Sequence, residues 1–365
     1  MGGVFRLTEG ATAWEQVTNG LPADCHVPCV TADPHDPNRI YAGTQEGPYV
    51  STDGGTIWRR LTFPRHDLQV WSIAVHPANP QRLYVGTSPL GVFISDDQDG
   101  TWQSARGVDL SDVADMRGFV NRVIRFAFDP ARPDEMFAAI EVRGVIHSTD
   151  GGESWSEQPN LKSAAITTNT AEGMLDVHAV KISPAEPEVP IIACRMGLFR
   201  SEDHGAHGKD LGMRGHSPIV YGRDIRFSPH DPATIYDTLS TLAMAATGSI
   251  WRSTDLGRNW RRFDSGLTVG STMMAVVPSP SNPDVVHAVT RKVQSFSTRD
   301  GGATWRRDLA GDANAGWLSW GDGAGREVTR PRHGQHRGRY GRSGEASSPD
   351  GEAAAAAPVR LSRCI

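Results

Sequence analysis

The sequence lacks the features that would place it in several large protein classes. Only four of its 365 residues are cysteines (Cys25, Cys29, Cys194 and Cys364), and none belongs to a CxxC pair. A disulfide framework and a zinc or redox motif are therefore not expected, and we interpret the cysteines as reduced, mostly buried thiols. No run approaches the roughly 18 apolar residues of a membrane helix, and the first residues lack the basic and apolar regions of a secretory signal. We expect a cytoplasmic protein with no membrane partner.

Strong net charge and the common catalytic motifs are missing as well. The chain has 37 Lys and Arg against 42 Asp and Glu, a net charge of −5 that is too close to balance to indicate a nucleic-acid partner. It contains no GxSxG and no GxxxxGK, which excludes a serine nucleophile elbow and a phosphate loop. The 13 histidines show no ligand spacing, and the calcium-like run at 95–100 has Arg106 where a bidentate Glu is needed. We expect no metal and no cofactor.

Glycine, proline and tryptophan are abundant, with 39, 24 and 10 copies. They recur at fixed intervals, which indicates many turns between short strands. The segment STDGGTIW at 51–58 returns as STDGGESW at 148–155, STDLGRNW at 253–260 and TRDGGATW at 298–305. Weaker copies are SDDQDGTW at 95–102, SEDHGAHG at 201–208 and LTEGATAW at 7–14. The last positions of these seven boxes lie 44 to 53 residues apart, the size of one repeat each.

A second unit precedes each later box. It consists of a short apolar strand, a turn containing proline, and another apolar strand, as in 30–44 and 73–87. Alternating apolar runs bounded by Pro and Gly are typical of β-strands. Each repeat therefore has four strands, which is the blade of a β-propeller. The sequence predicts an all-β, seven-bladed propeller of four-stranded antiparallel blades, with the box in the turn between the third and fourth strands.

The S-x-D-x-G-x-T-W boxes resemble the Asp-box (BNR) repeats of sialidases, xyloglucanases, sortilin-type receptors and photosystem II assembly factors, all of them propellers. The resemblance covers about residues 1–310 and implies the fold but no particular activity. The box itself explains its residues, because Asp and Ser side chains accept backbone N–H groups in the turn, Gly supplies a positive φ and Trp covers the hairpin. The resemblance also implies that the boxes lie opposite the substrate face. We therefore assign a structural role to Asp53, Asp97, Asp150, Asp203, Asp255 and Asp300.

The predicted ring closes irregularly. The first box has its two outer strands at residues 3–17 but no inner pair before them, so we expect inner strands to come from the C-terminal region, where 316–320 could supply one. We predict a propeller over residues 1–310 and a low-complexity, disordered tail over 311–365. The Arg- and Gly-rich run at 332–342 leaves two interpretations open: an RNA-binding arm, or a disordered or frame-shifted extension.

A propeller binds its ligand with the loops that lead into the first strand of each blade and the loops between its second and third strands. In this chain those loops are rich in Arg and His. If they converge, they favour a carboxylate, sulfate or phosphate ligand through guanidinium contacts. The alternative is that they pair with carboxylates of neighbouring blades. The ligand-binding candidates are His66, Trp71, Arg122, Arg125, Arg143, Arg195, Arg223 and Arg291.

A glycosidase needs two carboxylates beside the scissile bond, one protonated and one ionised. The best-placed catalytic candidates are Glu141, Asp176 and Asp224, with His178 or Tyr221 assisting. By family resemblance a sialidase would also need an Arg-Ile-Pro segment ahead of the first box. The sequence has none, so we do not expect a sialidase.

Two hypotheses follow. The first is a sialidase-like propeller that acts as a binding or assembly module for an anionic small molecule, a glycan or a peptide segment. The alternative is a glycoside hydrolase or lyase of the BNR-repeat type, which requires two carboxylates about 5 to 10 Å apart on the loop side of the ring. We expect a monomer that does not bind nucleic acid.

Overall fold

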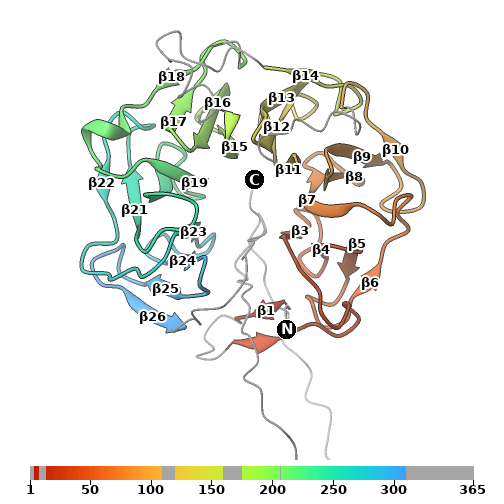
Figure 1. The fold of residues 1–365 in the computed structure, drawn as a ribbon, viewed down its shortest axis with the longest axis horizontal. Helices are drawn as coiled ribbons and strands as arrows, with labels where there is room; N and C mark the ends of the chain where they lie inside the picture. The colour runs from red at the N-terminus through yellow and green to blue at the C-terminus, as the bar shows by residue number, and fades with distance from the viewer. Residues whose placement is uncertain (1–3, 8–13, 109–119, 159–174, 206, 310–365) are drawn as a thin grey trace, which may run out of the picture.

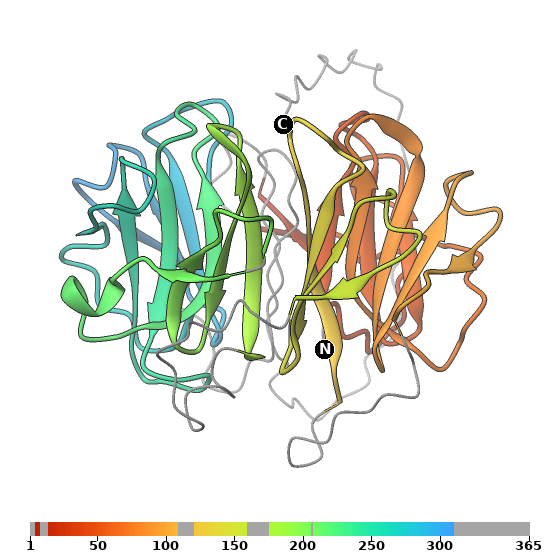
Figure 2. The same ribbon diagram turned by 90° about the horizontal axis from the view of Figure 1, so that it is seen from above.

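Six four-stranded antiparallel sheets surround a common axis in the computed structural model (Figure 1). The structure describes residues 4–7, 14–108, 120–158, 175–205 and 207–309. Each sheet is a meander in which the four strands pair in chain order, with the first strand nearest the axis. Figure 2 shows these strands lengthwise, running along the axis of the ring. This arrangement confirms the predicted propeller of four-stranded antiparallel blades.

The blades are numbered here in chain order. Blade 1 contains β3 (Cys29–Ala32), β4 (Ile40–Thr44), β5 (Gly47–Ser51) and β6 (Arg59–Arg60); blade 2 contains β7 (Gln69–His76), β8 (Asn79–Ser88), β9 (Gly91–Ser95) and β10 (Gln103–Ser104). Blade 3 contains β11 (Arg122–Phe128), β12 (Met136–Glu141), β13 (Gly144–Ser148) and β14 (Ser156–Glu157). Blade 4 contains β15 (Val177–Ser183), β16 (Glu186–Cys194), β17 (Gly197–Arg200) and β18 (Lys209–Asp210), followed by a 3₁₀ turn, η2 (Met213–Gly215). Blade 5 contains β19 (Tyr221–Phe227), β20 (Ile235–Ser240), β21 (Gly248–Ser253) and β22 (Arg261–Arg262); blade 6 contains β23 (Met273–Pro278), β24 (Val286–Thr290), β25 (Ser295–Thr298) and β26 (Arg306–Leu309).

A two-stranded sheet lies between blade 6 and blade 1 (Figure 1). It pairs β1 (Phe5–Arg6) with β2 (Glu15–Gln16). Val4 and Val17 pack into the core of blade 1, and Trp14 packs against Ala275 and Val289 of blade 6. The described residues therefore contain six complete blades and one pair of strands, where the sequence predicts seven blades. The closing strand expected at 316–320 lies outside the described residues.

Apolar side chains fill the space between the blades. The strands β4, β5, β9 and β12 are buried at every position, whereas the fourth strands of blades 1 to 5 are exposed. Blades pack face to face, as where Ile124 and Phe137 of blade 3 meet Val180 of blade 4. Cys25, Cys29 and Cys194 form no disulfide and are buried in these layers, while Cys364 lies outside the described residues. No helix in the described part of the chain is long and apolar enough to cross a membrane.

The direction of the chain separates two faces of the ring. Each first strand runs toward the proline turn, the second returns, and the third runs back toward the box. The starts of the first strands and the turns between second and third strands therefore share one face, which we call the loop face. The proline turns and the boxes share the opposite face, the Asp-box face.

The Asp box forms a compact network of hydrogen bonds in the turn between the third and fourth strands. The Ser51 hydroxyl donates to Asp53 Oδ1 (2.7 Å) and accepts the N–H of Gly55 (2.8 Å), and Asp53 Oδ1 also accepts the N–H groups of Thr56 and Ile57 (2.9 Å each). Gly55 has a φ of 92°, a conformation that favours glycine. The bond from the box hydroxyl to the carboxylate recurs at Asp53, Asp97, Asp150, Asp203, Asp255 and Asp300.

Replacing one box carboxylate should destabilise the ring. Asp150 accepts bonds from Ser148 and Ser154, so Asp150→Ala is expected to lower the free energy of unfolding by about 1–2 kcal/mol at pH 7. Burial tends to raise the pKa of Asp150, but the bonds from Ser154 and Ser148 outweigh it and lower the pKa below its usual range. The difference between wild type and variant should therefore shrink as pH falls below that range. Urea unfolding at pH 7 and pH 3 measures both effects.

The matched control is Glu153→Ala in the same box. The Glu153 side chain is half exposed and its contact with Arg82 is 3.5 Å long, so its removal should change stability by less than about 0.5 kcal/mol. Equal losses for the two variants would contradict a structural role specific to the box carboxylate.

One buried carboxyl group has no such support. Asp237 stands in the middle of β20 with no exposed surface, and its oxygens meet no well-aligned hydrogen-bond donor among the described residues. Burial, together with the nearby Asp224, raises the pKa of Asp237 well above its usual value, although the backbone N–H of Thr238 opposes the shift. The folded protein therefore holds this proton to a higher pH than the unfolded chain does.

The raised pKa makes folding stability fall as pH rises. The protonated Asp237 makes its full contribution to the free energy of unfolding below the pKa that this group has in the unfolded chain, near 4. The contribution is lost as pH rises toward the pKa in the folded protein. Asp237→Asn should therefore exceed the wild type in stability by at least about 1 kcal/mol at pH 8 and match it near pH 4. Urea unfolding between pH 4 and pH 8 tests this, with the exposed Asp24→Asn as a control that should leave the profile unchanged. Parallel profiles for wild type and Asp237→Asn would refute it.

Candidate functional site

The first strands of five blades are bulged close to the loop face. The pairing with the second strand shifts by one residue within the first three residues of β7, β11, β15, β19 and β23. A bulge leaves one residue outside the hydrogen-bonded ladder and changes the direction of its side chain. The residues left out are Trp71, Ile124, His178, Arg223 and Met274. Three of these five are site residues predicted from the sequence.

Two arginines hold Glu141 at the end of β12. Arg122 Nε lies 2.5 Å from Glu141 Oε2, and Arg223 Nη1 lies 3.8 Å from Oε1. All three side chains are largely buried. Burial lowers the pKa of Arg122, and the Glu141 carboxylate opposes that shift. The charge of Glu141 is thus shared between guanidinium groups from blade 3 and blade 5.

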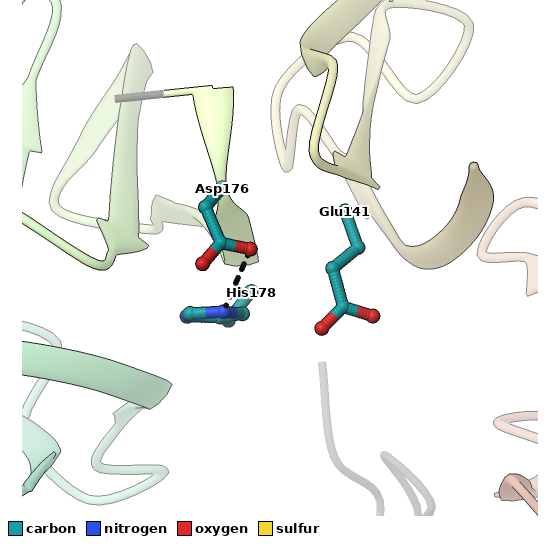
Figure 3. Close-up of side chains that lie close together, drawn as sticks. All are labelled: Glu141, Asp176 and His178. Carbon is teal, nitrogen blue, oxygen red and sulfur yellow. Dashed lines mark ion pairs between the residues drawn. The ribbon is translucent and has the colours of Figure 1, made fainter. Parts of the chain in front are cut away.

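His178 connects blades 4 and 5 and meets Asp176 and Tyr221. Its Nδ1 lies 2.6 Å from the carbonyl oxygen of Gly222 and must therefore carry a hydrogen. Its Nε2 lies 3.2 Å from Asp176 Oδ1 and 3.2 Å from the Tyr221 hydroxyl. Figure 3 shows the Asp176–His178 pair beside Glu141, with the side chains coming from two adjacent blades. The imidazole can thus accept a hydrogen from Tyr221 when neutral, or donate one to Asp176 when protonated.

The two groups next to His178 have shifted pKa values. Burial tends to raise the pKa of Asp176, but the hydrogen bond and charge of His178, together with the charges of Arg223 and Arg195, outweigh it and lower the pKa. Burial raises the pKa of Tyr221 to about 12 against the opposing charge of Arg223. Asp176 is therefore an anion and Tyr221 a neutral hydroxyl over the physiological range.

Trp71 forms the side of the site toward blade 2. The Arg122 guanidinium carbon lies 4.0 Å from the centre of the indole ring, a cation–π contact, and His26 meets the same indole edge-on at 5.7 Å. Trp71 Nε1 donates to Gln69 Oε1 over 3.3 Å. One face of the indole is thus covered by Arg122, which fixes the guanidinium that binds Glu141.

Glu141, Asp176 and His178 offer the donor set closest to a metal site among the described residues. One ligand atom from each lies within 4.8 Å of the others. His178 Nε2 is the available nitrogen, because Nδ1 is bound to Gly222. Both Glu141 oxygens, however, face the guanidiniums of Arg122 and Arg223, which would repel a cation. The electrostatics of this cluster suit an anion better than a metal ion.

Several predicted residues lie elsewhere. Asp224 is fully buried and accepts hydrogen bonds from Arg226 Nε (3.0 Å) and from the N–H of Val276 in blade 6. Arg143 is paired with Glu157. The remaining candidates contact other groups: His66 lies 3.3 Å from Arg60, Arg125 donates to the Ile124 carbonyl, and the Arg291 amide donates to the Thr272 carbonyl. Arg195 is exposed beside Asp176.

The sequence analysis did not detect the bulges, although the sequence carries a signal for them. Each bulged residue stands six positions before a proline in the turn between the first and second strands of its blade. These prolines are Pro77, Pro130, Pro184, Pro229 and Pro280. The residue two positions before the bulged residue contributes Gln69, Arg122, Asp176 and Tyr221 to the site. Aligning the blades on this proline would have placed these residues in one ring.

Neutralising Glu141 should be costly for folding. Glu141→Gln leaves Arg122 buried without its carboxylate, so we expect a loss of about 2–4 kcal/mol in the free energy of unfolding. The control is Glu157→Gln in the same blade, because its pair with Arg143 is half exposed and should contribute less than about 1 kcal/mol. Chemical denaturation measures the free energy of unfolding of both variants. Equal small losses would show that burial of the Arg122 guanidinium does not require the Glu141 carboxylate.

The boxes, the four-stranded blades and the site at the loop face define the chain as an Asp-box β-propeller. No known protein-family profile matches it. It is 28% identical over 180 residues to a probable oligoxyloglucan-reducing end-specific xyloglucanase of Neosartorya fischeri, a match that covers 44% of this chain and 21% of that protein.

Solved structures show the same fold. The GH74 xyloglucanase from Xanthomonas campestris superposes with a TM-score of 0.61 at 20% identity, covering 82% of this chain and 47% of that one. YCF48 bound to D1 peptide superposes with a TM-score of 0.53 at 13% identity, covering 80% and 84%. The chain thus spans about a fifth of the curated relative and about half of the xyloglucanase structure.

Proposed function

We propose that the protein is a binding module whose ligand carries a negative charge and binds at the loop face beside Glu141 and Asp176. One observation carries the proposal: the two carboxylates are surrounded by three guanidinium groups, those of Arg122, Arg223 and Arg195. Three guanidinium groups against two carboxylates leave one positive charge in excess. Arg195 is the exposed member and would make the first contact with the ligand.

Glycoside hydrolysis is the second candidate, because Glu141 and Asp176 approach each other closely and xyloglucanases share the fold. Hydrolysis needs one carboxyl group that keeps its proton. Asp176 has a lowered pKa, which favours its ionised form, and the Glu141 carboxylate lies against two guanidinium groups. The surroundings of these carboxylates therefore favour binding over acid catalysis.

Arg195 should determine the affinity for anions. Calorimetric titration with glucuronate, sulfate, phosphate and a glutamate-containing peptide should detect binding of at least one of them, and Arg195→Ala should weaken it about tenfold. Arg59→Ala is the control, because Arg59 is an exposed arginine on the outer strand β6 and should leave the affinity unchanged.

Two results would overturn the proposal. One is the absence of heat and of any thermal shift with all four anions. The other is release of reducing sugar from xyloglucan oligosaccharides that is lost in Asp176→Asn, which would establish the hydrolase instead.

We also propose that the ring has seven blade positions and that residues 1–310 form one domain. The β1–β2 sheet supports this proposal because it contacts both blade 1 and blade 6, as the outer strands of a seventh blade would.

A further inference from the structure

Large apolar side chains are exposed at only a few described positions, and most of these are on the loop face. Four such side chains are exposed: Ile57 (56%), Val120 (40%), Leu242 (51%) and Met244 (69%). Ile57 belongs to a box on the Asp-box face. The other three are on the same face as the cationic site.

The three apolar side chains lie on both sides of that site. Val120 is two residues before Arg122, at the start of blade 3. Leu242 is two residues after Ser240, which pairs directly with Tyr221 in blade 5. Blade 4, with Asp176, His178 and Arg195, stands between them (Figure 1). A charged centre thus has an apolar side chain on each flank.

The loop that carries Leu242 and Met244 is held in place by the next blade. The Thr272 hydroxyl accepts the N–H of Ala245 (2.8 Å) and lies within hydrogen-bond distance of the carbonyl oxygens of Leu242 and Ala243. The backbone of the loop is therefore anchored while its two long apolar side chains remain in solvent. Such anchored, exposed apolar groups are typical of interaction surfaces.

The surface offers little to a sugar ring. Among the described residues no Phe, Tyr or Trp is exposed. At the site Tyr221 is buried, and Trp71 has a face covered by Arg122 and packs against the core between blades 3 and 4. A pyranose ring would therefore find no exposed aromatic side chain among the described residues on which to stack. Aliphatic side chains such as Leu242 and Met244 instead suit the aliphatic side chains of a peptide.

Building on the proposed function, we propose that the ligand is an extended peptide segment that spans blades 3 to 5. In this arrangement an acidic side chain of the peptide contacts Arg195 and Arg223. Apolar side chains of the peptide on either side of it contact Val120 and the Leu242–Met244 loop. The guanidinium groups supply charge recognition, and the apolar flanks supply the preference for sequence.

Fluorescence anisotropy with labelled nine-residue peptides and the full chain tests the proposal. The reference peptide has acetylated and amidated ends, a central glutamate, leucine at the second and third positions on each side, and serine elsewhere. A second peptide carries glutamine at the centre, and a third carries serine in place of every leucine. The reference peptide should bind about tenfold more tightly than either.

Two protein variants locate the contact. The double variant Leu242→Ser/Met244→Ser should lose about tenfold in affinity for the reference peptide but retain that for the serine-flanked peptide. Ile57→Ser replaces the exposed apolar side chain on the opposite face and should change neither. Both variants alter exposed side chains, and thermal unfolding confirms that they fold.

The outcomes separate the two proposals. Equal binding of the leucine- and serine-flanked peptides overturns the peptide inference and leaves the anion site standing. Equal binding of the glutamate and glutamine peptides overturns both. A xyloglucan heptasaccharide that binds more tightly than the reference peptide overturns the peptide inference in favour of a glycan.

Discussion

The blades of this propeller are joined mainly by side chains, because each four-stranded sheet pairs its strands only within itself; a backbone bridge between Arg106 and Ser154 also connects blades 2 and 3. Several of these connections come from the inner strands. Thr31 donates to the Ile73 carbonyl of the next blade, Ser72 to the Val123 carbonyl and His178 to the Gly222 carbonyl, over 2.6 to 2.8 Å. Val123 and Gly222 border bulges, where the ladder is interrupted. The bulge therefore frees a carbonyl group that the preceding blade uses.

The candidate site is a consequence of this way of joining blades. His178 occupies the bulge of blade 4, and its bond to Gly222 both connects blade 5 and fixes the imidazole so that Nε2 meets Asp176 and Tyr221. Arg223 occupies the bulge of blade 5 and reaches Glu141 of blade 3. The same distortion that assembles the ring thus gathers charged groups from three blades at the loop face.

The sequence predicted the repeating part of this molecule better than its site. The boxes specify the turn through local hydrogen bonds, so their spacing predicted the blades, whereas the face on which the boxes lie was implied by the resemblance to Asp-box repeats. The sequence also named Glu141, Asp176 and His178 as catalytic candidates, and the fold brings these three side chains together. It could not separate them from Asp224, because Asp224 follows the bulge in β19 and therefore turns toward Val276 of blade 6. A one-residue shift in pairing decides which side chains reach the loop face, and no composition or charge pattern reports it.

The fold shared with xyloglucanases and with YCF48 leaves the chemistry to be decided by a few side chains. Here the decisive group is His178. When its imidazole is neutral, both Nε2 and the nearby Asp176 Oδ1 are hydrogen-bond acceptors. The Tyr221 hydroxyl then supplies the hydrogen that Nε2 accepts. When the imidazole is protonated, Nε2 donates to Asp176 and the Tyr221 hydroxyl becomes available to a ligand.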